Sequence, residues 1–383
     1  MPALIKAFKI RLYPTKEQEA LMWRHVGACR FIWNHFLNLQ EERYKAGEKF
    51  MSAFDMSYLM PPLKKQEEFQ WLNDIAAQTL NRELADLADA YKDFFKKKAR
   101  HPKYKSRKRS KASFPTAQII YFEDGKVTVG KIGKVKYKTD FDLPQGKGNK
   151  FTNPRISNIC GKWMLSFGMD CPEEHPELNA GTSVGIDLGI KELAVASHQK
   201  QMITVPNINK TDEVRRLEKN LRHLQRSVSR KYEAAKKRTG RYEKSNNILK
   251  EEEKIRRLHH RLDCIRQNHV HQATHYFVSL LPERIVMEDL NVTGMMKNRH
   301  LSKAIGQQGF AEFRRQIAYK SDWNGIETVY ADRFYPSSKT CSVCGHIKPD
   351  LKLSDRTYVC SECGAVLDRD FNAAVNLENY VPQ

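Results

Sequence analysis

The stretch GIDLGI at residues 185–190 predicts a strand that ends on a carboxylate, Asp187. Two further acids lie in similar contexts later in the chain. Glu288 ends the apolar run IVME at residues 285–288, and Asp370 lies in DRDFNAA at residues 368–374, where a helix is expected to begin. The ends of strands bring acids that are distant in the sequence together at one edge of a sheet. Because clustered carboxylates repel one another unless a cation lies between them, the three acids predict a site for divalent metal ions.

This arrangement of acids is typical of a ribonuclease H-like nuclease domain that holds two hard divalent cations. Hydrophobic periodicity predicts further elements of such a domain. They are strands over 183–188, 193–197, 202–205, 284–288 and 326–330, and helices over 309–323 and 370–380. Between residues 214 and 265, apolar residues three and four apart predict two antiparallel helices with basic outer faces, separated by a break at Gly240.

Each acid has an alternative interpretation. A GIDLG strand also begins actin-like ATPases and sugar kinases, but the small hydroxyl residues that contact phosphate in those proteins do not follow it here. Asp289 competes with Glu288, although alternation along a strand places the two side chains on opposite faces. Asp368 competes with Asp370, which we prefer because it lies at the expected start of the helix. We therefore predict that Asp187, Glu288 and Asp370 are catalytic and bind Mg²⁺, which prefers such hard oxygen ligands.

Four cysteines between the second and third acids form two CxxC pairs, with 15 residues between the pairs. This spacing is typical of a zinc ribbon. Four thiolates complete a tetrahedron and leave no open position, so the predicted Zn²⁺ is structural. Two redox motifs are the alternative, but no thioredoxin-like context surrounds them. The predicted zinc ligands are Cys341, Cys344, Cys360 and Cys363.

The charge of the chain indicates a polyanionic partner. Among its 383 residues, 66 are Lys or Arg and 45 are Asp or Glu, which gives a net charge of +21. A nucleic acid is favoured over a membrane because no apolar run is long enough to span a bilayer. No signal peptide is visible, and the four remaining cysteines suit a reducing interior better than a disulfide framework. We expect a cytoplasmic protein that is associated with the nucleoid when it is bound to DNA.

Residues 96–111, which we call the basic tract, contain ten Lys or Arg residues and no acid. A charge run of this kind is often a solvated surface segment. Here, however, Tyr104 lies within it and structured segments are expected on both sides, so a loop that contacts phosphate groups is the better interpretation. The predicted nucleic-acid contacts are Lys103, Lys105, Arg107 and Arg109.

The first half of the chain has a different pattern. Residues 4–13 alternate as a strand, and Thr15 with Gln18 predicts a capping box at the start of the following helix. A second helix is expected over 75–97. Short strand patterns broken by Gly, Asn and Pro over 118–168 predict a small antiparallel sheet or barrel, which the first strand is expected to join. Residues 172–180 are expected to be a linker.

Several motifs together resemble those of TnpB, a family of transposon-encoded RNA-guided DNA endonucleases related to type V CRISPR effectors. The resemblance covers nearly the whole chain. It is carried by GIDLG at 185–189, IVMEDLNV at 285–292, DRFYPSSKTC at 332–341, DRD at 368–370 with NAA at 372–374 and Asn376, LYPT at 12–15 and FIWN at 31–34. The acids and cysteines do not depart from the family's motifs in a way that would indicate an inactive relative.

The resemblance implies a multidomain fold of mixed α/β structure with a β-barrel, a helical lobe, and a RuvC-like nuclease domain into which a zinc ribbon is inserted. The expected domains are a wedge β domain over 1–14 and 116–180, a helical recognition lobe over 15–115, a RuvC-like domain over 181–336 and 366–383, and a zinc ribbon over 337–365.

The resemblance also implies partners. A guide RNA from the transposon end would pair with one strand of double-stranded target DNA, and the protein would read a short duplex motif beside the target. For the chemistry we expect two-metal phosphodiester hydrolysis, in which Asp187 bridges both ions and the other two acids bind one each. A strand-transfer transposase with a similar acid triad and a non-cutting RNA-guided DNA-binding protein are the alternatives. The number of chains per complex is left open.

Overall fold

In the computed structural model the chain divides into two compact units, an N-terminal unit of residues 1–172 and a C-terminal unit of residues 173–383. The structure describes residues 4–116, 120–172, 175–352 and 355–382. The predictions made above for residues 1–3, 117–119, 173–174, 353–354 and 383 therefore lie outside the described residues.

The N-terminal unit contains an antiparallel sheet in the order β2-β6-β7-β1-β5-β4-β3. Its first strand, β1 (Leu4–Tyr13), pairs with β7 along nearly its whole length, which confirms that the first strand joins the later sheet. The edge strands β2 and β3 have four residues each and do not pair with one another, so the predicted barrel is corrected to an open half-barrel among the described residues. The other bounds are β2 (Ala112–Pro115), β3 (Ile120–Glu123), β4 (Lys126–Val129), β5 (Gly133–Lys138), β6 (Phe151–Ile159) and β7 (Lys162–Cys171).

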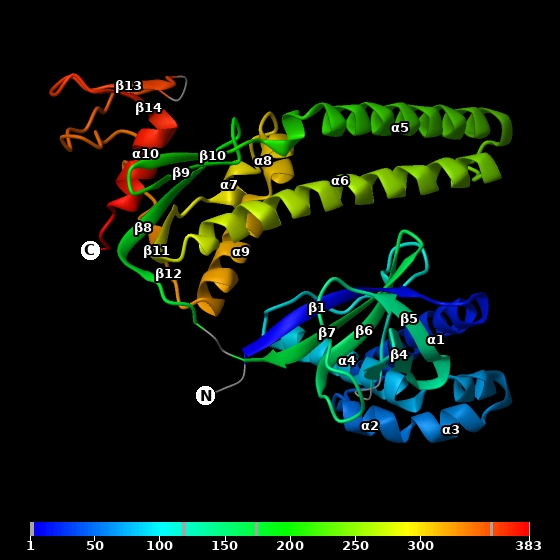
Figure 1. Ribbon diagram of the computed structural model, residues 1–383. Coiled ribbons are helices and arrows are strands. Elements are labelled where there is room, and N and C mark those ends of the chain that lie inside the picture. The colour runs from blue at the N-terminus through cyan, green and yellow to red at the C-terminus, as the bar shows by residue number, and fades with distance from the viewer. Residues whose placement is uncertain (1–3, 117–119, 173–174, 353–354, 383) are drawn as a thin grey trace. The chain divides into compact units, whose positions relative to one another are not determined.

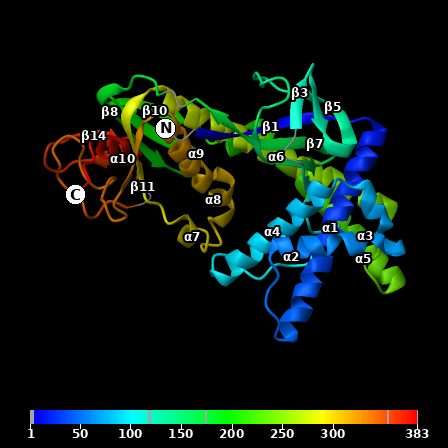
Figure 2. The same cartoon turned by 90° about the horizontal axis from the view of Figure 1, so that it is seen from below.

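The long helix α1 (Lys16–Lys45) connects this sheet to the other helices of the unit. It begins with the predicted capping box, in which Thr15 and Gln18 exchange hydrogen bonds. One side of α1 packs on the core of the sheet, and the other packs against the remaining helices (Figure 2). These are α2 (Ala53–Tyr58), α3 (Met60–Lys65), η1 (Glu67–Asp74) and α4 (Ala77–Phe95); η2 (Gly130–Ile132) lies within the sheet region. Helix α1 therefore packs against both the half-barrel and the other helices of the unit.

The C-terminal unit is built on a sheet in the order β10-β9-β8-β11-β12. Strands β10, β9 and β8 are antiparallel, whereas β8, β11 and β12 are parallel. The five predicted strands are confirmed, although β8 begins within the expected linker. The bounds are β8 (Asn179–Leu188), β9 (Ala194–His198), β10 (Gln201–Val205), β11 (Pro282–Glu288) and β12 (Glu327–Ala331).

Helices cover both faces of this sheet (Figure 1). On one face, α6 (Asn246–Ser279) and α9 (Phe310–Trp323) bury an apolar core. On the other, α10 (Arg369–Glu378) packs against β8 and β11. The predicted antiparallel helix pair is confirmed as α5 (Asp212–Thr239) and α6, and α5 ends at Gly240 in the left-handed conformation. Shorter elements are η3 (Ile208–Lys210), α7 (Val292–Met295) and α8 (Ser302–Gln308). Of the helices in the described ranges, none is both long and apolar enough to cross a membrane.

The first glycine of the GIDLG stretch explains how α10 reaches the sheet. A Cβ atom at Gly185 would overlap the backbone of α10 at Ala374 and Glu378. The backbone of β8 and that of α10 therefore touch at this point, and only glycine permits the contact. Since Asp187 follows two residues later and Asp370 lies in α10, this crossing sets the approach of the first acid to the third.

Candidate metal centres

Asp187 and Glu288 lie on the same face of the C-terminal sheet. Along β8, Ile186 packs in the core below α6 and α9, so alternation turns Asp187 to the face that α10 covers. Along β11, Met287 lies in that same core and Glu288 is turned to the α10 face. The parallel register pairs Ile186 with Met287, so the two acids are neighbours on adjoining strands.

The electrostatics of Asp187 show that the acids influence one another. Burial raises the pKa of Asp187 well above its usual range, and the carboxylates of Glu288 and Asp370 raise that pKa further. Arg369 has a smaller, opposite effect. The three carboxylates carry more negative charge than Arg369 balances, and a divalent cation would balance the remainder. The hard oxygen atoms of this set fit Mg²⁺.

A serine holds the second acid. Ser337 is buried, and its hydroxyl donates a hydrogen bond of 2.5 Å to Oε1 of Glu288. The carbonyl oxygen of Ser337 in turn accepts a hydrogen bond of 2.7 Å from Nδ2 of Asn376 in α10. Both residues belong to motifs quoted for the family resemblance, but nothing in their spacing indicated these contacts. Glu288 is thus tied to the helix that carries the third acid.

The two candidates for the third acid have different environments. Asp368 is the N-cap of α10, and its side chain accepts a hydrogen bond of 2.9 Å from the backbone N–H of Phe371. Asp370 lies in the first turn and has Arg356 3.9 Å away. Asp370 also affects the pKa of Asp187 more strongly than Asp368 does. Asp368 therefore serves as the cap of the helix, and Asp370 is the acid of this pair that acts more strongly on Asp187.

The neighbour of Glu288 is engaged elsewhere. Asp289 forms ion pairs with Arg314 at 3.0 Å and with Arg333 at 2.5 Å. Hydrogen bonds from Arg333 and Arg314 lower the pKa of Asp289. Asp289 lies one residue beyond the end of β11, and its two ion pairs leave Glu288 as the acid of this pair at the strand end.

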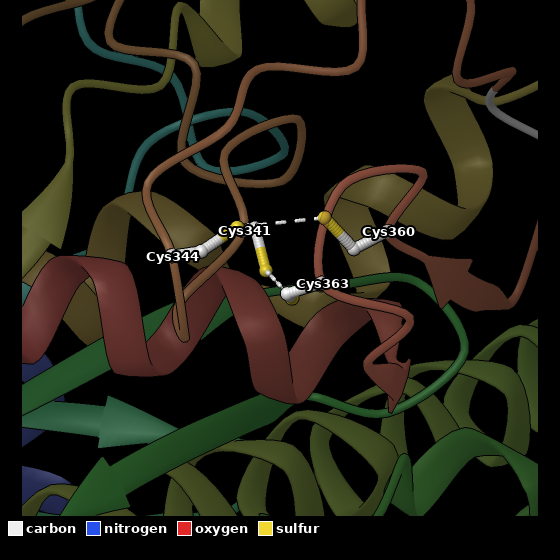
Figure 3. Close-up of side chains that lie close together, drawn as sticks. All are labelled: Cys341, Cys344, Cys360 and Cys363. Carbon is white, nitrogen blue, oxygen red and sulfur yellow. Dashed lines mark hydrogen bonds between the residues drawn. The ribbon is translucent and has the colours of Figure 1, made fainter.

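The four cysteines of the CxxC pairs lie together (Figure 3). All four Sγ atoms are within 4.8 Å of one another, with Cys341 and Cys363 3.7 Å apart and Cys344 and Cys360 3.5 Å apart. Four sulfur atoms placed tetrahedrally about 2.3 Å from one zinc ion would be about 3.8 Å apart. The donor set therefore fits Zn²⁺ in both chemistry and spacing. The backbone N–H of Cys363 lowers the pKa of Cys360 to about 6, whereas hydrogen bonds among the clustered thiols contribute to a raised pKa of Cys344 and of Cys363.

Both CxxC pairs have the same backbone shape. The carbonyl oxygen of Cys341 accepts a hydrogen bond from Gly345, and that of Cys360 accepts one from Gly364. Both glycines have positive φ angles, 77° and 71°, which glycine adopts with little strain. The second pair lies between the short strands β13 (Thr357–Val359) and β14 (Val366–Asp368). Each turn thus directs its two thiols to a common point.

Among the described residues, the donor atoms of these four cysteines lie close enough together to share one metal ion. The three carboxylates are less tightly gathered. The two centres are nevertheless connected, because Nδ2 atoms of Asn372 and Asn376 both donate to the carbonyl oxygen of Thr340, at 2.7 Å each. Thr340 directly precedes Cys341, and Asn372 lies two residues after Asp370.

The structure gives the four predicted nucleic-acid contacts two different environments. Lys103, Arg107 and Arg109 are exposed. Lys105 is half-buried, forms an ion pair with the buried Glu83, and lies 3.6 Å from the centroid of the Trp33 ring. The tract is anchored through its backbone as well, because the carbonyl oxygens of Lys103 and Lys105 accept hydrogen bonds from Trp33 and Asn34.

Models of three families match the chain. Residues 1–49 match a helix-turn-helix domain of the IS605 OrfB type, residues 166–299 match the IS605 OrfB family described as "Probable transposase", and residues 310–377 match the Cas12f1-like TNB domain. Two curated relatives share the name "Putative RNA-guided DNA endonuclease". InsQ of Escherichia coli (strain K12) is 32% identical over 97% of this chain and 91% of its own length. The relative from Streptomyces pristinaespiralis is 33% identical over 98% and 89%. The chain belongs to the TnpB family.

The family membership confirms the resemblance inferred from the motifs. A solved structure supports the fold of this TnpB-family chain. It is the cryo-EM structure of a complex of Cas12f1, sgRNA and target DNA, which superimposes with a TM-score of 0.55 and 15% identity over 98% of this chain and 99% of that chain. At this level of identity the likeness concerns the fold alone.

Proposed function

We propose that this TnpB-family protein is an RNA-guided DNA endonuclease that cuts target DNA by two-metal phosphodiester hydrolysis. The observation that carries the proposal is the placement of Asp187 and Glu288 on the sheet face that α10 covers, with Asp370 close enough to raise the pKa of Asp187. The net charge of +21 supports a nucleic-acid partner. The names of the relatives and the RNA and DNA bound to Cas12f1 support both partners.

The sheet order supports a RuvC-like, ribonuclease H-like domain over 181–336 and 366–383. Three antiparallel strands continue into two parallel ones, the acids lie on the central strands β8 and β11, and α10 crosses them. The segment 337–365 is then a zinc ribbon inserted before the last helix. Residues 1–14 and 116–180 would form the wedge domain and residues 15–115 the recognition lobe. The N-terminal unit ends at residue 172, so the wedge would end there, and residues 179 and 180 begin β8 of the C-terminal sheet.

The residues of the chain have distinct roles in this chemistry. Asp187 would contact both Mg²⁺ ions, and Glu288 and Asp370 one each. When bound, the two ions supply an activated water and stabilise the oxygen that leaves the phosphodiester. Ser337 orients the Glu288 carboxylate, and Asp368 caps the helix on which Asp370 is presented. Cys341, Cys344, Cys360 and Cys363 hold a structural Zn²⁺.

The proposal includes a guide RNA from the transposon end and a double-stranded target, with a short duplex motif read by the protein. It places the protein in the cytoplasm, at the nucleoid when it is bound to DNA. Sequencing the RNA that copurifies with the chain identifies the guide, and a plasmid library that carries the matching target beside random bases identifies the motif.

The direct test is cleavage of that matched plasmid. The wild-type complex should cut it only with Mg²⁺, and Asp187→Ala, Glu288→Ala and Asp370→Ala should each abolish cutting while RNA and target binding remain. Asp289→Ala and Asp368→Ala are the matched controls and should reduce cutting less, because these acids serve an ion pair and a helix cap. If Asp368→Ala abolished cleavage and Asp370→Ala did not, the third ligand would be Asp368.

A strand-transfer transposase is the second candidate, because residues 166–299 match the family described as "Probable transposase". Such an enzyme would join the cut ends to a second DNA. Sequencing the products separates the two activities, since an endonuclease leaves free ends. A non-cutting RNA-guided protein is disfavoured because all three acids are present.

A further inference from the structure

Phe334 has the most exposed large apolar side chain among the described residues, with 88% of its surface accessible. Single exposed apolar residues are common on protein surfaces. Whether the exposed ring has a function therefore depends on where it lies and on how firmly its backbone is held.

The backbone on both sides of Phe334 is fixed. The side chain of Asp332 accepts a hydrogen bond of 2.8 Å from the N–H of Phe334, and the carbonyl oxygen of Asp332 accepts one of 3.0 Å from Tyr335. The next aromatic ring, that of Tyr335, packs against Tyr380 with 4.9 Å between ring centroids. Phe334 is thus an exposed ring on a rigid turn, since its neighbours are held and its own side chain is left free of the core.

Residues on both sides of Phe334 contact Glu288 or its neighbour Asp289 at the candidate metal centre. Arg333 pairs with Asp289, the residue after Glu288. Ser337, three residues after Phe334, donates its hydrogen bond to Glu288 itself. The turn that carries the exposed ring is therefore tied to Glu288 and to its neighbour Asp289.

The charges near this turn suit a nucleic-acid backbone. Arg314 and Arg333 share the single carboxylate of Asp289, so one positive charge is not balanced by that acid. Arg333 remains about half exposed. An aromatic ring near an exposed guanidinium group, here that of Arg333, is the combination that binds single-stranded nucleic acid, because bases stack on the ring and phosphates contact the cation.

We propose that Phe334 stacks on an unpaired nucleobase of the DNA strand whose phosphodiester enters the metal centre. This inference rests on the proposed function. Stacking would hold the strand in one register beside Glu288 without selecting a sequence, because every base has a π-face. Phe334 is therefore a substrate-positioning residue.

The test uses the full chain with its copurified RNA and an Asp187→Ala change that prevents cutting. The probe is a labelled single-stranded DNA of mixed sequence without complementarity to the RNA. Phe334→Ala should weaken binding of this probe about 5- to 150-fold, the range expected for loss of one stacked base. Phe334→Trp should retain the affinity. The dependence of affinity on salt should not change, because phosphate contacts remain.

A probe with the same sugar–phosphate backbone but no bases separates stacking from other contacts. Its affinity should be equal for the parent and the Phe334→Ala protein. Phe54→Ala is the matched control, because Phe54 is also exposed, at 66%, but lies on α2 in the N-terminal unit. An unchanged affinity of Phe334→Ala for the base-bearing probe, an equal loss with the abasic probe, or an equal loss in the Phe54 variant would overturn the proposal.

Two further probes assign the strand. Duplex DNA should show no loss, since its bases are already stacked, and an equal loss there would contradict stacking on an unpaired base. A loss with single-stranded RNA but not with DNA would overturn the assignment to the DNA strand. All of these are binding measurements in a non-cutting background, so their failure is separate from failure of the cleavage test for the proposed function.

Discussion

Glu288 of the candidate centre is held by residues that carry no charge. Ser337 donates to Glu288, Asn376 holds the backbone of Ser337, and both Asn372 and Asn376 hold the residue before the first cysteine. The acids and cysteines could be predicted from the sequence because metal chemistry requires those residue types at restricted spacings. A serine or an asparagine has too many uses for its role to be predicted without knowing what it faces in the fold.

We predict that Ser337→Ala lowers the affinity for Mg²⁺ by about 10- to 150-fold, because a hydrogen bond to a charged group contributes about 1.5–3 kcal/mol. Calorimetric titration of the protein with Mg²⁺ measures this directly, and the Mg²⁺ concentration needed for half-maximal cleavage should rise in parallel. Ser337→Thr keeps the hydroxyl and is the control that should retain most of the affinity. Equal Mg²⁺ affinity in the alanine variant would show that the serine does not position the acid.

At the scale of elements, strands β8 and β11 and helix α10 have to meet before the acids can act together. Hydrophobic alternation predicts the strands correctly because one face of each is buried below α6 and α9. The crossing of α10 over β8 could not be predicted in the same way. It depends on a backbone contact between residues almost two hundred positions apart, and Gly185 alone gives no sign of its partner.

Gly185→Ala should separate α10 from the sheet, because the new Cβ atom would overlap the backbone of the helix. We expect a loss of stability of about 1–3 kcal/mol, as for other overpacked sites, together with a loss of cleavage. Thermal unfolding and plasmid cutting measure the two effects. Gly27→Ala is the matched control, since nothing lies within 4 Å of its added Cβ atom and it lies in α1. A fully active Gly185→Ala protein would contradict the close crossing.

The cluster of four cysteines should influence the acids through the segment between them. We predict about one zinc ion per chain, as expected for four thiolates, measured by metal analysis. Cys363→Ser should release the zinc and reduce cleavage, because loss of the turn before β14 frees the start of α10 and Asp370 with it. Ser361→Ala is the control, because Ser361 lies between Cys360 and Cys363 and its replacement removes no metal ligand. Undiminished cleavage by zinc-free protein would refute the coupling.

At the scale of the whole molecule, the net charge of +21 predicts a polyanionic partner but does not say which residues bind it. A charge run does not distinguish a lysine that faces solvent from one that pairs with a buried acid. Lys105 pairs with Glu83, whereas Lys103, Arg107 and Arg109 remain exposed and can bind phosphate groups.

Replacing Lys103, Arg107 and Arg109 together by Ala should weaken binding of RNA or of target duplex. The log–log slope of affinity against salt should fall by roughly one unit for each phosphate that the protein no longer neutralises. Base preference should change little, because phosphate contacts carry no sequence information. Lys105→Ala is the internal control: it should destabilise the N-terminal unit by leaving Glu83 buried without its partner, and should change the salt slope less. If the triple variant keeps the slope for both ligands, the basic tract is a solvated loop.

The proposed function requires that the bound RNA chooses the DNA that the acids cut. The most direct measurement gives the protein an RNA whose guide portion has been rewritten to match a second plasmid, with the rest of the RNA unchanged. Cutting should move to the second plasmid, should require Mg²⁺, and should be absent in Asp187→Ala. Cutting that stays on the first plasmid, or that does not depend on the guide sequence, would contradict RNA-guided cleavage by this protein.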